Sequence, residues 1–422
     1  MYLKTILIIF VSAFCSSFIT FAQNDKQKEL ELLINKIKNS HEEIPWNDLE
    51  HLSDFINVNP SLDYSSKELV PLLIKYLAIP ISQVEPEIKT NYYSFRALRF
   101  LSKLGIPISS DLGEALNSNN EALCGASLYT LAFLEEDNRK NFIPKILKLC
   151  RHENGDVREY ATLALFRIGG STPEIISELT FQLGDFAYNR NLARSFLKEI
   201  GIPAIPYLIQ ALENENEEIR RFAAVTLRDI GSIAREAIPA LLVALKDEYD
   251  LAQDAIEKAL LKIATDKTEL TLNLIKIIKS ENFRTRKGAI EILEKLLYVK
   301  NKEIFYVKKK DSLFQEIVVP LIIEALKDER WEVRSAATSA LGAVQFDWEK
   351  VVLLLTEMLQ DKEWQVRKSA IVAFGSLSPP KATILPPLLK GLEDEYWEVR
   401  EASARVLTGR VGGKESIQSF SL

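Results

Sequence analysis

A period of 33 residues near the C-terminus constrains the fold of this chain more than any other feature. Three segments align there without gaps, and each runs from an aspartate through a tryptophan to a Val-Arg pair: Asp328–Arg334, Asp361–Arg367 and Asp394–Arg400. An apolar segment precedes each of them and an alanine-rich segment follows. Such a period is the signature of a solenoid, in which each unit buries its apolar faces only by stacking on its neighbours.

The period continues upstream, and the arginine of the Val-Arg pair marks it; we call this position the arginine slot. Most spacings between slots lie between 30 and 34 residues, and one, from Arg286 to Arg334, is 48. Ten residues beyond the slot, an apolar residue and a glycine recur, as in Ile168-Gly169, Ile200-Gly201 and Ile230-Gly231. Glycine suits the residue that ends a helix. Upstream of Arg334 the slot holds Arg286, Gln253, Arg220, Arg190, Arg158, Cys124 and Ser94.

Each unit contains two helical patterns separated by a polar turn. In the unit from Ile202 to Gly231, the first pattern has apolar residues at 3.6-residue spacing, and prolines lie in its first turn, where a missing N–H costs little. Similar first-turn prolines are predicted at Pro239, Pro320 and Pro386. The sequence therefore predicts an all-α protein, an α-solenoid of about ten antiparallel helix pairs over residues 65–408.

The Asp, Val-Arg and Ala-Ala-x-x-Leu-Gly pattern resembles HEAT repeats, in particular the HEAT-like subgroup named after phycobilisome lyases. The units from Asn141 to Thr408 carry this pattern, and weaker units extend it to about Ser65. The resemblance implies a right-handed superhelix that serves as a scaffold or binding surface. It implies no activity, because a fold does not determine a function.

The two ends of the array have their own patterns. Residues 23–64 hold two amphipathic helical patterns, Asp25–Ser40 and Asp48–Asn57, which are predicted to cap the first repeat. Residues 409–422, with Gly412-Gly413, are predicted to form a flexible tail.

The first 22 residues have the layout of a secretory signal peptide. Lys4 is their only charge, Thr5–Phe21 is almost entirely apolar, and Ala22 precedes a polar run. We therefore expect cleavage before Gln23 and a periplasmic or extracellular protein that is not integral to the membrane after cleavage. The alternative is a membrane anchor, for which the apolar stretch is borderline in length.

Composition and motifs exclude several functional classes. Lys and Arg number 53 and Asp and Glu 59, so the net charge is −6, which disfavours nucleic acid as a partner. The sequence contains no HExxH, phosphate-binding glycine loop, Cys-x-x-Cys or Gly-x-Ser-x-Gly. His41-Glu42 and His152-Glu153 are similar to pairs in deoxyhypusine hydroxylase, but that family needs four such pairs. We expect no enzyme, no catalytic residue, no metal and no cofactor.

Two cysteines, Cys124 and Cys150, follow the leader. An oxidising compartment permits a disulfide between them. Both lie in apolar helical patterns, however, so two buried thiols are the favoured interpretation.

Three groups of residues are candidates for function. The first is an aromatic row three residues before the slot, formed by Phe283, Trp331, Trp364 and Trp397, with many acidic residues nearby. Such a row can hold a cationic peptide or stack on sugar rings. Alternatively each tryptophan opens a second helix and packs on the neighbouring unit, as buried tryptophans commonly do.

The second group is an Asp–Arg ladder formed by Asp328, Arg334, Asp361, Arg367, Asp394 and Arg400. The resemblance implies hydrogen bonds between the turns of successive repeats. As exposed ion pairs, they are expected to contribute about 0–1 kcal/mol each.

The third group is an insertion over residues 297–313, which accounts for the long spacing after Arg286. Insertions in solenoids are often on the binding face, and a basic aromatic loop suits an anionic lipid, a polysaccharide or an acidic partner. A tolerated surface loop is the alternative. Its candidate residues are Lys300, Lys302, Phe305, Tyr306, Lys308, Lys309 and Lys310.

The sequence thus favours an exported, non-catalytic scaffold that binds an unidentified protein. The alternative is a module that binds carbohydrate or the cell envelope through the aromatic row.

Overall fold

The computed structural model describes a helical chain. Every regular element among its described residues is a helix, which confirms the predicted all-α solenoid. The predicted leader lies outside these residues, as do His41 and Glu42. The described residues are 23–39, 46–60, 62–64, 68–77, 98–99, 107–134, 137–303, 314–344, 348–377 and 381–411.

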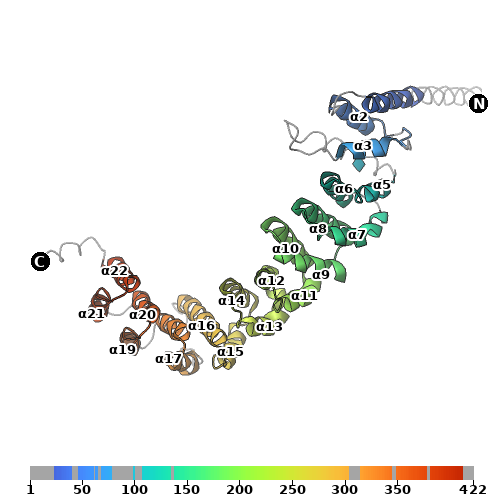
Figure 1. Cartoon of the computed structure of the whole chain (residues 1–422). Helices are drawn as coiled ribbons and strands as arrows, with labels where there is room; N and C mark the ends of the chain where they lie inside the picture. The colour runs from blue at the N-terminus through green and yellow to red at the C-terminus, as the bar shows by residue number, and fades with distance from the viewer. Residues whose placement is uncertain are drawn as a thin grey trace, which may run out of the picture. The chain divides into compact units, whose positions relative to one another are not determined.

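The chain forms two compact units, Met1–Pro203 and Ala204–Leu422. In the first unit, residues 23–38 are helical, as the cap pattern predicts. The labelled helices of this unit, shown in Figure 1, are α2 (Trp46–Val58), α3 (Leu69–Leu77), α5 (Ser109–Ala115), α6 (Glu121–Phe133), α7 (Ile143–Leu149), α8 (Gly155–Gly169), α9 (Pro173–Phe181) and α10 (Ala187–Ile200).

The second unit continues the alternation of a shorter first helix and a longer second helix. Short 3-10 or π-helical segments, such as η5 (Gly231–Ala237) and η6 (Phe314–Val318), lead into some first helices. The helices are α11 (Ile205–Ala211), α12 (Glu217–Ile230), α13 (Ile238–Ala244), α14 (Asp250–Ile263), α15 (Lys267–Ile277), α16 (Phe283–Glu303), α17 (Val319–Ala325), α18 (Trp331–Gly342), α19 (Trp348–Met358), α20 (Trp364–Ser376), α21 (Lys381–Gly391) and α22 (Trp397–Val411).

Each unit stacks its helix pairs through the second helices. In the first unit α8 packs between α6 and α10, and in the second unit α18 packs between α16 and α20. Each second helix also packs on the first helix of its own pair. We call the surface that the second helices share the second-helix face.

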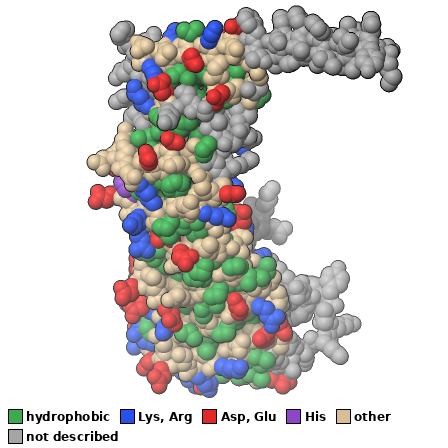
Figure 2. Space-filling model, turned by 90° about the vertical axis from the view of Figure 1, so that its right-hand side faces the viewer, with side chains coloured by type: hydrophobic (Ala, Val, Ile, Leu, Met, Phe, Trp, Pro, Cys, Tyr) green, Lys and Arg blue, Asp and Glu red, His purple; other side chains and the backbone are tan. Residues whose placement is uncertain are grey.

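The opposite side carries the first helices, and its surface mixes polar and apolar side chains. In the second unit Val243, Leu272 and Leu353 are exposed on first helices. On the face shown in Figure 2, hydrophobic side chains lie among charged ones of both signs. No helix among the described residues has both the length and the apolar character that a bilayer crossing requires.

Helix ends follow local rules, with two corrections. Gly201 and Gly231 end α10 and α12 at positive φ as predicted, but after α8 the residue at positive φ is Gly170, because Gly169 still belongs to the helix and its Cα faces Ile175.

Pro239 and Pro320 lie in the first turns of α13 and α17. The prediction for Pro386 is wrong, because α21 begins earlier, at Lys381, and contains this proline in its interior.

The insertion and the tail differ from their predicted boundaries. Residues 297–303 are a helical continuation of α16 rather than a loop, and they include Lys300 and Lys302. The remaining candidates of the insertion, Phe305, Tyr306, Lys308, Lys309 and Lys310, lie outside the described residues. At the C-terminus α22 continues to Val411, so the helix includes the first residues assigned to the tail.

Cys124 and Cys150 are free, buried thiols in this structure, in agreement with the favoured interpretation. Burial raises the pKa of both thiols. They therefore act as small apolar side chains of the core.

Close helix packing gives a first testable prediction. A Cβ at Gly342 meets the Cα of Ala373 at 2.9 Å, so α18 and α20 approach as closely as a missing side chain allows. We predict that Gly342→Ala destabilises the protein by about 1–3 kcal/mol in urea unfolding. Gly409→Ala is the matched control, because a Cβ at Gly409 meets nothing within 4 Å, and it should be neutral or stabilising by about 0.5–1 kcal/mol. Equal effects of the two substitutions would contradict the packing argument.

Candidate functional site

The arginine slot links the turns of successive repeats. Arg334 donates from Nε and Nη2 to the two carboxylate oxygens of Asp361 at 2.7 and 2.8 Å. Its Nη1 donates to the carbonyl oxygens of Asp328 and Glu329 at 3.0 and 3.2 Å. The guanidinium thus holds its own turn with one nitrogen and the next turn with the other two. We call this arrangement a rung.

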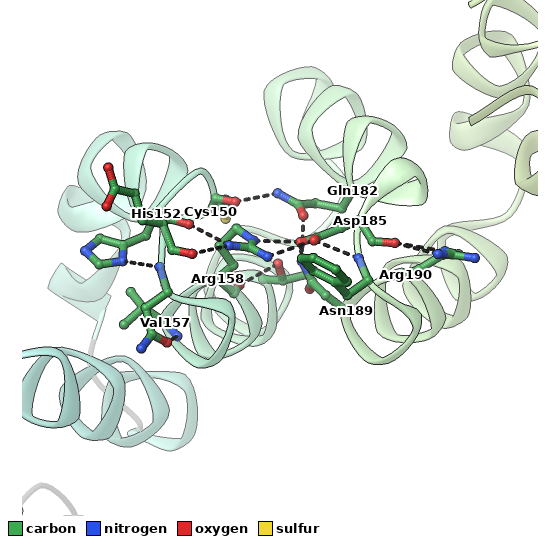
Figure 3. A network of polar contacts seen from close by, with 12 residues as sticks. Cys150, His152, Val157, Arg158, Gln182, Asp185, Asn189 and Arg190 are labelled. Atoms are coloured by element: carbon green, nitrogen blue, oxygen red, sulfur yellow. Dashed lines mark hydrogen bonds and ion pairs between the residues drawn. The ribbon is translucent and has the colours of Figure 1, made fainter. Parts of the chain in front are cut away.

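The same rung recurs in both units. Each acceptor aspartate of the second unit also accepts a hydrogen bond from the backbone N–H two residues later, as Asp361 does from Glu363 at 2.9 Å. The bonds from each slot arginine to the aspartate of the next turn are the hydrogen bonds between turns that the resemblance implies. The other rungs join Arg158 to Asp185 (Figure 3), Arg220 to Asp247, Arg286 to Asp328 and Arg367 to Asp394.

The expectation that these are exposed pairs is wrong. The side chains of Arg334 and Asp361 are each 9% exposed. Stacking of the turns covers both partners, which the sequence pattern alone does not reveal. Removing one partner of a buried pair leaves an uncompensated charge and is costly, whereas loss of an exposed pair is not.

The contacts of the rung lower the pKa of its aspartate. Burial alone would raise the pKa of Asp361, but hydrogen bonds from Arg334 and from a backbone N–H, with the arginine charge, lower it below its ordinary value. The pKa of Asp394 is lowered for the same reasons. A depressed folded-state pKa means that the rungs of Asp361 and Asp394 contribute their full stability above about pH 3.9, the ordinary pKa of aspartate, and lose it as the pH falls through the folded value.

Some slots depart from the rung. Gln253 replaces the charge with neutral hydrogen bonds to the carbonyl oxygens of Leu245 and Arg284 at 3.2 and 3.1 Å. Arg400 bonds the carbonyl oxygens of Asp394 and Glu395 at 2.8 and 2.9 Å, but it has no aspartate partner among the described residues. It is the last slot among the described residues.

His152 belongs to a rung. Its Nδ1 accepts a hydrogen bond from the Asn154 N–H at 3.0 Å, and its carbonyl oxygen accepts one from Arg158 at 2.8 Å. The Glu153 carbonyl oxygen accepts another from Arg158. The His152-Glu153 pair therefore has a structural role in the turn, as Figure 3 shows for His152 and Arg158.

The aromatic row lies where the second helices begin. Trp331, Trp364 and Trp397 are the first residues of α18, α20 and α22, which is where the alternative interpretation places the tryptophans, and Phe283 is the first of α16. They are not core residues, however. Phe283, Trp331 and Trp364 are half-buried, and Trp397 is 60% exposed. The row thus presents ring surface at the edge of the second-helix face.

Neighbouring repeats cover two of these rings. Arg330, which precedes Trp331, lies over the Phe283 ring with its guanidinium carbon 4.1 Å from the ring centroid. Tyr396, which precedes Trp397, stacks on Trp364 at 6.0 Å between centroids. In these two repeats the residue before the second helix therefore covers the aromatic ring of the preceding repeat.

A cavity of about 410 Å³ lies beside Trp331. Phe283 and Trp331 contribute to its wall, and five carboxylates but only two cations line it. The pocket joins the starts of α14, α16 and α18 on the second-helix face. Its lining residues are Glu248, Asp250, Phe283, Arg284, Lys287, Glu291, Glu294, Trp331, Glu332, Ser335, Ala336 and Ser339.

Acidic residues next to this pocket are desolvated. Burial raises the pKa of Glu294. Burial, a hydrogen bond that protonated Glu257 donates to Glu291, and the Glu291 charge raise the pKa of Glu257 to about 8, even though Lys295 donates to Glu257 at 2.5 Å. The region between α14 and α16 is therefore crowded with carboxyl groups whose charged forms are poorly stabilised.

The sequence contained a signal for Glu257 that the repeat alignment did not use. Glu257 lies four residues after its slot, where Ala224, Thr338 and Ile371 are fully buried in other repeats. A glutamate at a core position is costly unless it has partners. This exception therefore points to the acidic region beside the pocket.

A second aromatic group, in the first unit, also escaped prediction. Tyr129 of α6 contacts Phe133 at 4.9 Å and Tyr160 of α8 at 5.9 Å between ring centroids. These residues do not share one position of the repeat, so the period does not reveal them. They add ring surface to the second-helix face of the first unit.

The fold and the repeated rung define this protein as a helical-repeat protein. A model of HEAT repeats matches residues 182–261, 271–373 and 352–421, which together exceed half of the chain. The chain belongs to the HEAT-repeat family. A search of curated proteins finds no match.

Solved structures show the same fold. The chain is similar to Kap121p, with 16% identity, a TM-score of 0.52 and coverage of 91% of this chain and 49% of that chain. Kap121p bound to Pho4p gives 15% identity, a TM-score of 0.54 and coverage of 91% and 49%. Kap121p bound to the SUMO protease Ulp1p gives 15% identity, a TM-score of 0.53, and coverage of 91% of this chain and 49% of that chain. The chain thus spans about half the length of Kap121p, and the likeness is one of fold.

The rung gives a second testable prediction. Arg334→Ala leaves Asp361 charged and buried without its partner, so we predict a loss of about 3–5 kcal/mol of unfolding free energy at pH 7. Arg400→Ala is the matched control at the same slot, and it should cost about 1 kcal/mol or less, because no aspartate pairs with it among the described residues. Urea unfolding monitored by circular dichroism measures both. A loss at Arg334 no larger than that at Arg400 would show that the buried rung is not a stabilising contact.

Proposed function

We propose that this protein is an exported scaffold that binds another protein on the second-helix face of its second unit, without catalysis. Membership of the HEAT-repeat family supports a binding role, because such arrays offer extended surfaces. Kap121p, of similar fold, has been solved bound to Pho4p and to Ulp1p. We also propose that the chain belongs to the phycobilisome-lyase-type subgroup on the basis of its Asp, Val-Arg and Ala-Ala pattern.

The observation that carries the proposal is the pocket beside Trp331. Its wall combines a half-buried tryptophan with charged and hydroxyl side chains, the mixture that binding sites favour. The rungs Arg286–Asp328 and Arg334–Asp361 fix the turns on either side of it. A preformed pocket on a rigid frame loses little entropy when a partner binds.

Export and the absence of catalysis are two further parts of the proposal, and features of the chain support each of them. The apolar run of residues 5–21, followed by Ala22, supports export to a periplasm or to the outside of the cell. The slot arginines, their aspartates and His152 all serve the turns, which supports a role for these polar groups in structure rather than in chemistry.

A glycan-binding module is the second candidate. Trp397 is 60% exposed and Tyr396 beside it is 42% exposed, so the end of the aromatic row offers ring faces on which a sugar can stack. Trp397 separates the two candidates, because only the glycan candidate requires it.

Photo-crosslinking tests the proposed binding face. We predict that p-benzoyl-phenylalanine in place of Ser339, which lines the pocket, forms an adduct with a protein exported by the same organism. The matched control carries the same group in place of Leu353, which is 67% exposed on a first helix, and should give little adduct. Equal yields at both positions, or adducts only at residue 353, would refute this location of the site.

Mass spectrometry of the secreted chain tests export. We predict a mature N-terminus at Gln23, and we predict that Ala22→Arg blocks cleavage, because the processing site requires a small residue. An uncleaved chain retained in the membrane fraction would instead support the anchor interpretation.

A further inference from the structure

We infer that the pocket beside Trp331 takes the guanidinium group of an arginine side chain presented by the protein partner. This inference rests on the proposed function and names the chemistry of the partner at that site. Three observations carry it: the register of the aromatic row, the charge of the pocket lining, and the way in which the chain covers its own rings.

The register leaves Trp331 without a cover. Arg330 covers Phe283, and Tyr396 covers Trp364 from 32 positions further along the chain. The residue 32 positions after Trp331 is Glu363. A carboxylate is repelled by the negative face of an indole ring, so Glu363 does not replace a cation or an aromatic ring there. Among the described residues, Trp331 has no stacking or cation–π partner.

The lining is negative, and its cations already have partners. Arg284 pairs with Asp250 at 3.5 Å. Lys287 pairs with Glu291 at 3.5 Å and donates to Gln253 at 3.3 Å. These pairs account for both cations and two of the five carboxylates of the pocket, and Arg330 pairs with a third, Glu332, at 2.8 Å. The lining therefore keeps an excess of negative charge that a bound cation would neutralise.

Glu294 is the carboxylate that most needs a partner. It lines the pocket, it is half-buried, and within the described part of the chain it forms no hydrogen bond or ion pair. Burial raises its pKa, and the charge of Lys295 offsets this only in part. A cation that enters the pocket would meet both this carboxylate and the Trp331 ring in its lining.

Guanidinium fits this arrangement better than ammonium. It is planar, weakly hydrated and able to stack on an aromatic face while it donates to carboxylates in its own plane. The chain itself shows this contact one repeat earlier, where Arg330 lies over Phe283 and donates to Glu332 at 2.8 Å. The cavity of about 410 Å³ admits a side chain and lies at the small end of ligand pockets.

The test measures binding of fluorescein-labelled hexa-arginine to the mature chain at physiological salt. Hexa-lysine, hexa-glutamate and spermine are the comparison ligands. We expect hexa-arginine to bind at least about fivefold more tightly than hexa-lysine, since only the guanidinium both stacks and donates in its plane. Hexa-glutamate should not bind.

Three variants alter the pocket, and two serve as matched controls. Trp331→Leu and Glu294→Gln should each weaken hexa-arginine binding by about tenfold or more. Glu363→Arg places an arginine 32 positions after Trp331, where we expect it to lie over the indole ring. It should therefore compete with hexa-arginine for the pocket and weaken its binding. Trp397→Leu, at the same repeat position, and Glu349→Gln, an exposed acid on a first helix, should leave binding within about twofold. Thermal melting establishes that each variant is folded.

The outcomes separate the inference from the proposed function. Equal binding by all variants would overturn the inference, since nonspecific attraction would then account for it. Spermine that competes as well as hexa-arginine, with the same dependence on Trp331, would also overturn it, in favour of a free polyamine. If the residue 339 crosslink persists while hexa-arginine does not bind, the scaffold stands and the arginine site fails. If neither is observed, both fail.

Discussion

The buried ion pair between the arginine of one turn and the aspartate of the next is the contact on which the rest of the array depends. Taking both charges out of water is costly, so the pair stabilises only when its hydrogen bonds are satisfied. In the rung of Arg334, three guanidinium nitrogens have acceptors, and both oxygens of Asp361 have donors. The pair therefore acts as a connector of defined geometry rather than as a surface charge contact.

This connector sets the register of everything carried by the turns. Because Asp328, Asp361 and Asp394 each lie three residues before their own second helix, these rungs also fix where a tryptophan begins that helix. The contact between Arg286 and Asp328 spans 42 positions instead of 27, yet its two distances are 2.8 and 2.9 Å, as in the other rungs. The insertion thus lengthens the connection without disturbing the stacking, and the pocket beside Trp331 lies next to this rung.

Much of this architecture could be predicted from the sequence, because the 33-residue period reports the helix pair, its turn and the slot directly. The positions of Trp331, Trp364 and Trp397 at the starts of second helices followed from the same period. The burial of the rungs did not, since the cover comes from neighbouring turns. The prediction for Pro386 was wrong because the proline pattern does not distinguish the first turn of a helix from its interior. The pocket depends on three helices, and only the misplaced Glu257 hinted at its acidic surroundings.

The most direct test of the rung as the central connector is a double-mutant cycle of Arg334→Met and Asp361→Leu, measured by native-state hydrogen exchange of the amides in α18 and α20. Hydrogen exchange reports local opening free energies, which suits an array whose repeats do not unfold as one unit. The account predicts that each single variant strongly lowers protection in these two helices. It also predicts that the double variant recovers part of that loss, with a coupling energy of about 1–3 kcal/mol. Effects that add to within about 0.5 kcal/mol would contradict it, since the two side chains would then stabilise the array independently.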